Sequence, residues 1–237
     1  IHVAEIQIGK TSKLTQFDFD ISGIKAAEQL TIRLSVNETA YENNWSLWVY
    51  PDGITEAAAS GTLVTRSFAE AEKALKQGKN VLLNPELKEL NGLEGKFVQV
   101  FWSPVHFPDQ PGTMGLLMDP AHPVFKTFPT EFHSNWQWWD LCKQSKTIDI
   151  SEIKVTPLVR VVDNFYKNRS LCSLFEVKAG QGKLIFSSMD LSADLDKRTE
   201  ANHLRQSVLN YMNSEAFNPT EEVPFEELKK RFKTTVN

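Results

Sequence analysis

The stretch GTLVTRSFAEAEKALKQGKNVLLN, residues 61–84, carries the clearest fold signal in the chain. It begins with a short apolar strand and ends with a second one, NVLLN. Between the two strands, Ser67 is placed as the N-cap of a helix, Glu70 follows three residues later as in a capping box, and Gly78 provides the stop. Strand, helix and strand within ~25 residues is typical of the βαβ unit of a parallel sheet.

The chain beyond this unit supplies more strands and another helix. Apolar runs predict strands at 97–102, 157–162, 173–180 and 183–191. The turn AGQGK between the last two predicts a hairpin, and residues 199–214 predict an amphipathic helix. We therefore expect residues 55–219 to form an α/β domain whose mostly parallel sheet is flanked by helices and mixed at one edge. Residues 220–237 are expected to form a C-terminal helical tail.

Residues 1–54 have a different pattern, that of short antiparallel strands. Alternating apolar residues predict strands at 2–8, 14–21, 30–36 and 45–51, the last ended by Pro51. A layer of this size buries little by itself. We expect it to be part of a β-sandwich that packs on the α/β domain through Trp45, Trp48 and Tyr50.

Composition excludes several classes of protein. The chain has 237 residues, 24% charged and 41% hydrophobic, with a net charge of -4, which gives no basic surface for nucleic acid. No window approaches the ~18 apolar residues of a membrane span. The start at Ile1 lacks a signal peptide and opens in strand-like alternation, so we expect a piece of a longer polypeptide. Cys142 and Cys172 lie in apolar runs and are expected to be buried and reduced.

Motifs for common catalytic and cofactor sites are missing. No phosphate-binding loop is present, and we expect no cofactor. Ser103 is the best candidate nucleophile, with His106 and Asp109 near it, but its bulky neighbours do not suit a nucleophile elbow. The histidines, even with Glu131 two residues before His133, do not have the spacing of a zinc site, so no metal is expected.

The strongest site candidate is TFPTEFHSNWQWWDLC, residues 127–142, which holds three tryptophans. In a helix capped by Ser134 or Asn135, Trp136, Trp139 and Asp140 share one face, and Trp138 points elsewhere. With His133 and Asn135 beside them, these residues are candidates for binding carbohydrate. The alternative is a packed seam between the two layers, since each large aromatic buries some 150–250 Å². We favour the seam, with a helix start whose tryptophans are mainly buried and with His133 and Asn135 fixing the loop.

A family resemblance adds to this reading. Residues 43–51, 95–141, 168–191 and 201–219, and the run HPVFKTFPTEFHSNWQWWDL at 122–141 above all, resemble the C-terminal region of certain bacterial glycoside hydrolases of family 2, which are beta-galactosidase-like. The resemblance implies a degenerate glutamine-amidotransferase-like, flavodoxin-like fold without its nucleophile. It also implies a catalytic (β/α)8 barrel elsewhere, because a barrel needs ~250 residues.

The resulting functional expectation is a non-catalytic accessory region of a periplasmic or secreted glycosidase. The rest of that glycosidase would be its partner, and it could contact glycan; no catalytic residue is assigned in this chain. Two alternatives stay open: a carbohydrate-binding module with an exposed tryptophan face, and a stand-alone hydrolase using Ser103 or a pair of carboxylates. Exposure of Trp136 and Trp139 separates the first reading from the second.

Overall fold

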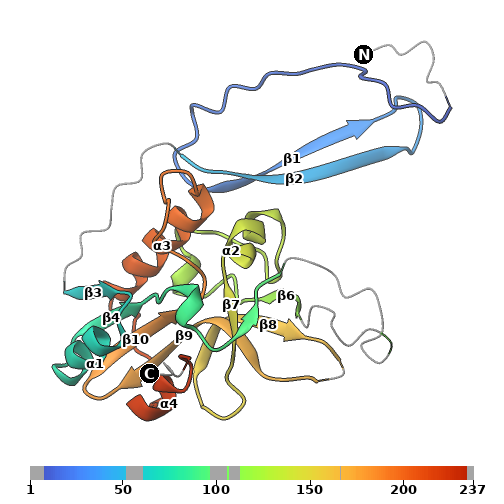
Figure 1. Cartoon of the computed structure of the whole chain (residues 1–237). Helices are drawn as coiled ribbons and strands as arrows, with labels where there is room; N and C mark the ends of the chain where they lie inside the picture. Colours follow the sequence, from blue (N-terminus) through green and yellow to red (C-terminus); the bar gives the residue numbers. More distant parts are fainter. Residues whose placement is uncertain (1–7, 52–60, 97–105, 107–112, 166, 234–237) are drawn as a thin grey trace.

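The computed structural model describes residues 8–51, 61–96, 106, 113–165 and 167–233. A two-stranded hairpin, β1 (Glu28–Ser35) and β2 (Glu42–Val49), lies above a larger unit built on an eight-stranded sheet. In Figure 1 the hairpin crosses over α2 and α3, which separate it from the sheet. The two units meet at the end of β2.

The large sheet has the order β3-β4-β10-β9-β7-β5, with β8 also beside β9 and β6 beside β8. Its strands are β3 (Thr62–Thr65), β4 (Asn80–Leu83), β5 (Leu93–Glu94), β6 (Thr113–Leu117), β7 (Lys146–Asp149), β8 (Thr156–Asp163), β9 (Leu171–Ala179) and β10 (Gly182–Ser187). The long strand β9 is therefore the centre of the sheet, since β10, β7 and β8 all pair with it.

The predicted βαβ unit is confirmed. β3 and β4 are parallel, and α1 (Phe68–Lys76) connects them. The Ser67 hydroxyl accepts a hydrogen bond from the Glu70 backbone N–H at 3.4 Å, which caps the helix. Gly78 follows the end of the helix with φ +78°, a conformation that glycine adopts at little cost.

The prediction of a mostly parallel, amidotransferase-like or flavodoxin-like sheet is wrong. Among the named strands of the described residues, only β3–β4 and β4–β10 pair in parallel, and the other strand pairs of the large sheet are antiparallel. The reason is the length of the connections. Parallel neighbours need a crossover of a dozen or more residues, whereas residues 180–181 alone join β9 to β10, and residues 164–170 join β8 to β9.

Helices cover both faces of the sheet, as expected. On one face, α3 (Thr199–Met212), α2 (Trp139–Lys143) and the 3-10 turns η2 (Pro123–Phe125) and η3 (Trp136–Trp138) bury residues such as Leu204, Trp138 and Phe125 against the strands. On the other face lie α1 and α4 (Phe225–Lys229), with Leu75 and Leu228 buried. The turn η1 (Leu87–Glu89) precedes β5. The C-terminal tail also pairs with β9, because Val223 N–H donates to the Lys178 carbonyl at 3.0 Å.

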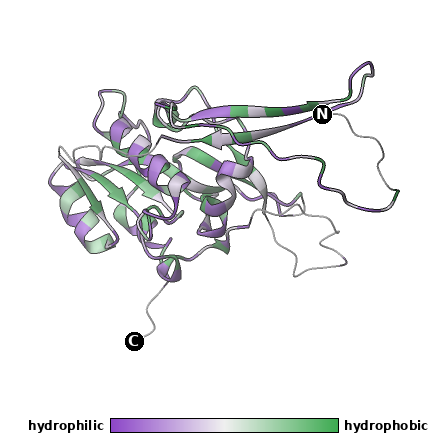
Figure 2. Cartoon of the chain, turned by 90° about the horizontal axis from the view of Figure 1, so that it is seen from above, coloured by the Kyte–Doolittle hydropathy of each residue, from purple (hydrophilic) through white to green (hydrophobic). Residues whose placement is uncertain are grey.

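The N-terminal layer is smaller than predicted. The β1–β2 hairpin confirms the strands expected around 30–36 and 45–51, but residues 14–21 form no strand, and the strand at 2–8 falls almost wholly outside the described residues. Figure 2 shows hydrophobic and hydrophilic residues alternating along the hairpin. Many of the apolar side chains of this region are exposed, among them Phe17, Phe19, Ile32, Leu34 and Trp45.

We expect that residues 1–50, produced alone, do not fold. A two-stranded hairpin is marginally stable at best in water, and the anchoring contacts of β2 lie on the large unit. The measurement is a proton–nitrogen NMR spectrum of the isolated segment, which should show the narrow amide dispersion of an unfolded chain. A dispersed spectrum with a cooperative thermal transition would contradict this.

Two further expectations concern the chain as a whole. Cys142 and Cys172 are both buried and unpaired, as predicted, and burial raises the pKa of the Cys142 thiol to about 12. No described helix has the length and apolar character needed to cross a membrane.

Candidate functional site

The candidate surface begins where the loop after η2 turns into a helix. Asn135 has extended backbone angles, and its side-chain oxygen accepts a hydrogen bond from the Gln137 backbone N–H at 3.2 Å. This cap starts η3, which continues directly into α2. The predicted helix start, with Asn135 fixing the loop, is confirmed.

The three tryptophans of this stretch divide between core and solvent. Trp138 is fully buried, whereas Trp136 is 73% exposed and Trp139 is 42% exposed. The prediction that they are mainly buried is thus wrong for two of the three. In a 3-10 turn, side chains three residues apart eclipse each other, so Trp136 and Trp139 lie on one side, away from Trp138 on the core side.

Trp138 is the tryptophan that packs into the core. Its ring packs edge-on against Phe128 at 5.4 Å and Phe125 at 6.2 Å between ring centroids, and its indole N–H donates to Thr130 Oγ1 at 2.9 Å. The indole ring is therefore packed against other rings, and its N–H group has a hydrogen-bond acceptor inside the protein. The core side of this turn is thus packed inside the large unit and not in a seam between the two layers, whereas the opposite side carries the exposed aromatic rings.

Polar groups next to the exposed rings form a chain of hydrogen bonds. Asn135 accepts from the Trp48 indole N–H at 3.1 Å and donates to Glu131 Oε2 at 2.8 Å. The same carboxylate oxygen lies 3.6 Å from His133 Nε2, and the His133 ring contacts Phe132. Two of the predicted polar site residues, His133 and Asn135, thus lie together around Glu131, and Trp48 connects them to the hairpin.

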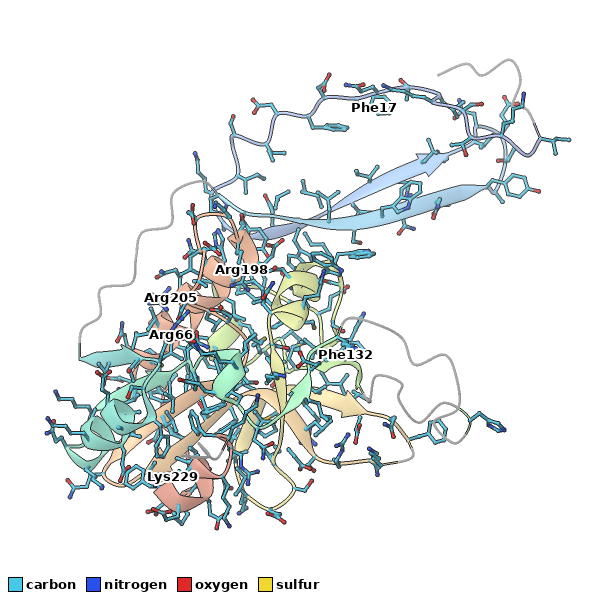
Figure 3. The ribbon with its side chains drawn as sticks, viewed as in Figure 1. Phe17, Arg66, Phe132, Arg198, Arg205 and Lys229 are labelled. Carbon is cyan, nitrogen blue, oxygen red and sulfur yellow. The ribbon has the colours of Figure 1, made fainter. Side chains whose placement is uncertain are left out.

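Asp140 has a different role from the one predicted. Its carboxylate accepts a hydrogen bond from Arg198 Nε at 2.7 Å, and Arg198 also lies 3.9 Å from Asp190. Arg198 stands at the start of α3, and in Figure 3 it lies between the hairpin and the sheet. Asp140 therefore links α2 to α3 by an ion pair, and sequence reasoning found no signal for this partner.

The hairpin is fixed beside this surface by Tyr50. Its hydroxyl donates to Gln137 Oε1 at 2.7 Å, and its ring lies tilted against His203, with 4.5 Å between the ring centroids. Burial lowers the pKa of His203. Docking through Trp48 and Tyr50 was predicted correctly; Trp45 is 49% exposed, so its predicted packing is wrong. Sequence reasoning missed Gln137, although it sits between two of the tryptophans.

The carboxyl edge of the parallel strands is occupied by the protein's own side chains. Such edges hold ligands in many α/β proteins. Here Asn84, which follows β4, donates to the Ser187 and Met189 carbonyls and accepts from Leu191 N–H and Ser192 Oγ. Arg66, after β3, lies 3.6 Å from Asp190. Figure 3 shows Arg66, Arg198 and Arg205 in this region, each of them engaged with neighbouring groups.

The remaining candidates from the sequence gain no support. Ser103 and Asp109 lie outside the described residues, and His106 is exposed. His122 Nδ1 accepts from the Val124 backbone N–H and so caps η2. No group of three or more His, Cys, Asp or Glu side chains in the described ranges is arranged to hold a metal. A cavity lined by Leu116, Cys142, Ser145 and Ser173 has room for only about one water molecule, too little for a sugar.

Two family models match the chain. One, described as "Domain of unknown function (DUF8487)", covers residues 63–233, and the other, described as "Domain of unknown function (DUF8488)", covers residues 1–51. The first contains the eight-stranded sheet except for Thr62, the first residue of β3, and the second contains the hairpin. No curated protein matches the chain.

Proposed function

The chain belongs to the family described as "Domain of unknown function (DUF8487)", and we propose that it is a non-catalytic region of a glycoside hydrolase that holds glycan on Trp136 and Trp139. We call these two side chains the tryptophan face. The proposal takes up the reading in which the face is exposed and acts as a carbohydrate-binding module does. The rest of the glycosidase, including its barrel, would be the partner, in the periplasm or outside the cell.

The exposure of the tryptophan face is the observation that supports this most. Large aromatic side chains are usually buried, and exposed ones that are grouped together typically mark an interaction site. Trp136 is 73% exposed although Trp138, two residues on, is fully buried. The apolar faces of sugar rings stack on indole rings, and the O–H groups at their edges need hydrogen-bonding partners, as tryptophan-rich surfaces with a polar rim provide.

The spacing of the two rings also suits a chain of sugars. A 3-10 helix rises about 2.0 Å per residue, so residues three positions apart are displaced by about 6 Å along the axis while facing the same way. Two aromatic positions in line favour an extended oligosaccharide over a single sugar. At the N-terminal end of this line, Asn135, Glu131 and His133 provide hydrogen-bonding groups.

The turn that carries the face is rigid. Trp138 anchors it to the core, the Asn135 cap fixes its first residue, and the Asp140–Arg198 pair fixes α2 to α3. A site that is already ordered loses little conformational freedom when it binds. This arrangement supports a binding function more than a flexible loop with the same residues would.

We propose glycan as the ligand because residues 43–219 resemble the C-terminal region of family 2 glycoside hydrolases in their sequence. A barrel of ~250 residues is longer than the whole chain, so catalysis would be the work of another part of such an enzyme. The antiparallel sheet rules out the amidotransferase-like architecture expected for this region, but the exposure of the tryptophan face does not depend on that architecture.

We expect Trp136→Ala to weaken glycan binding by roughly tenfold, since an aromatic stacking contact contributes up to about 1.5 kcal/mol. Its thermal stability should stay close to that of the parent, because little area is buried at this position. The measurement is affinity electrophoresis against a panel of plant and microbial polysaccharides, followed by calorimetry with the best oligosaccharide.

Phe165→Ala is the matched control, because Phe165 is also 73% exposed but lies after β8. It should bind like the parent. The proposal fails if no polysaccharide in the gel slows the migration of the parent protein. It also fails if Trp136→Ala and Phe165→Ala both bind glycan with the same affinity as the parent, because the tryptophan face then does not hold glycan.

A further inference from the structure

We infer that the glycan held by the tryptophan face is anionic, and that Lys143 binds the carboxylate or sulfate group of one of its sugars. The inference rests on the proposed function and names the substrate class of the same surface. It comes from the charges around Trp139.

Lys143 is held directly over Trp139. Its ammonium nitrogen lies 4.3 Å from the centroid of the indole ring, within the range of a cation–π contact. Both residues belong to α2, Trp139 at its start and Lys143 at its end. The positive charge therefore lies next to the tryptophan face.

The ammonium group of Lys143 has no acidic partner in the part of the chain that the structure describes. No carboxylate oxygen there lies within 4.0 Å of it. Other lysines do have such partners, for example Lys76 with Glu72 and Lys146 with Glu94. Asp140, the acid nearest in sequence, is bound by Arg198. A cation fixed on an aromatic ring without a counter-charge attracts an anionic ligand.

The two ends of the tryptophan face differ in charge. At the end near Trp136, Glu131 bonds to Asn135 and lies beside His133. At the end near Trp139, Lys143 provides the positive charge. Trp136 is the more exposed of the two rings, and Lys143 covers one side of Trp139, so a sugar stacks fully on Trp136 and only partly on Trp139. The neighbouring sugar then brings its charged substituent to Lys143.

The chemistry fits any compact anion on a sugar. A lysine ammonium is a point charge with rotatable donors, without the planar fork by which arginine selects carboxylates. Carboxylate and sulfate groups are both acceptors for it, so the experiment needs a separate arm for each.

The test compares three trisaccharides with the full chain by calorimetry: a uronic-acid trisaccharide, its carboxyl-reduced neutral form, and a sulfated neutral trisaccharide. The variants are Lys143→Gln and Lys143→Arg. Lys229→Gln is the matched control, because Lys229 is an exposed lysine on α4 and lies at the opposite end of the molecule from Arg198 in Figure 3.

We expect the parent to bind an anionic trisaccharide roughly two- to fivefold more tightly than the neutral one, as an exposed ion pair allows. The preference should shrink as salt is raised, because exposed charges are screened. Lys143→Gln should lose the preference and keep its affinity for the neutral form, whereas Lys143→Arg and Lys229→Gln should retain the preference. The trisaccharide for which the parent shows this preference, uronic or sulfated, identifies the anion.

Three results would overturn the inference, each in a different way. Equal affinity for anionic and neutral forms refutes the anionic class, and a preference that survives in Lys143→Gln refutes the role of Lys143; glycan binding stands in both cases. Absence of binding to all three trisaccharides and to the polysaccharide panel refutes the proposed function, and the inference falls with it.

Discussion

Trp138→Ala should lower the free energy of unfolding by about 3–5 kcal/mol, the usual cost of replacing a buried tryptophan by alanine. Trp138 is fully buried, and its ring packs edge-on against Phe125 and Phe128. The substitution leaves a cavity under α2 and removes the indole N–H that donates to Thr130 Oγ1. The measurement is denaturant unfolding followed by far-UV circular dichroism, which does not depend on the lost fluorophore.

Trp136→Ala is the variant to compare with Trp138→Ala, because it removes the same type of side chain two residues away. Its exposed position predicts a change within about 0.5 kcal/mol. The two variants together separate the core side of the turn from the tryptophan face. Similar stability losses for both would show that the turn does not divide its tryptophans between core and solvent.

Asn84→Ala is the second substitution with a large expected effect, a loss of about 3 kcal/mol or more. Asn84 is 1% exposed and makes four hydrogen bonds, at 2.6–3.1 Å, with the last residue of β10 and the segment that follows it. Its removal leaves the carbonyls of Ser187 and Met189 and the N–H of Leu191 without this partner in the interior. Each buried unsatisfied group costs about 1–3 kcal/mol.

Asn91→Ala is the control for this variant. Asn91 is exposed, so the change should stay within about 0.5 kcal/mol. Both variants are compared by chemical unfolding at the same pH. A loss below about 1 kcal/mol for Asn84→Ala would mean that the network at the carboxyl edge of β3, β4 and β10 does not stabilise the fold.

Parts of the candidate site could be predicted from the sequence alone. The side chain of Asn135 and the turn that follows it are set by residues within a few positions, and capping depends only on such neighbours. The opposite directions of Trp136 and Trp138 also follow from helical spacing. Which of the two directions faces the core does not follow, because it depends on where Phe125 and Phe128 lie in the folded chain.

Partners far apart in sequence were not predictable in the same way. Gln137 accepts from Tyr50 across 87 positions, and Asp140 pairs with Arg198 across 58. No periodicity or spacing encodes such pairs, since they form only when α2, α3 and the hairpin come together. The prediction of the Trp48 and Tyr50 contact succeeded because a small apolar hairpin must pack on something.

By itself the sequence determined the local elements: the β3–α1–β4 unit, the β9–β10 hairpin, α3, and the burial of both cysteines. Caps, turns and hydrophobic periodicity act over a few residues, so they can be read directly. The tertiary structure alone decided how these elements pair, making a mostly antiparallel sheet around β9 and turning Trp138 inward while Trp136 faces solvent. Strand partners and buried faces are set by connection lengths and by the packing of distant segments, which no local pattern contains.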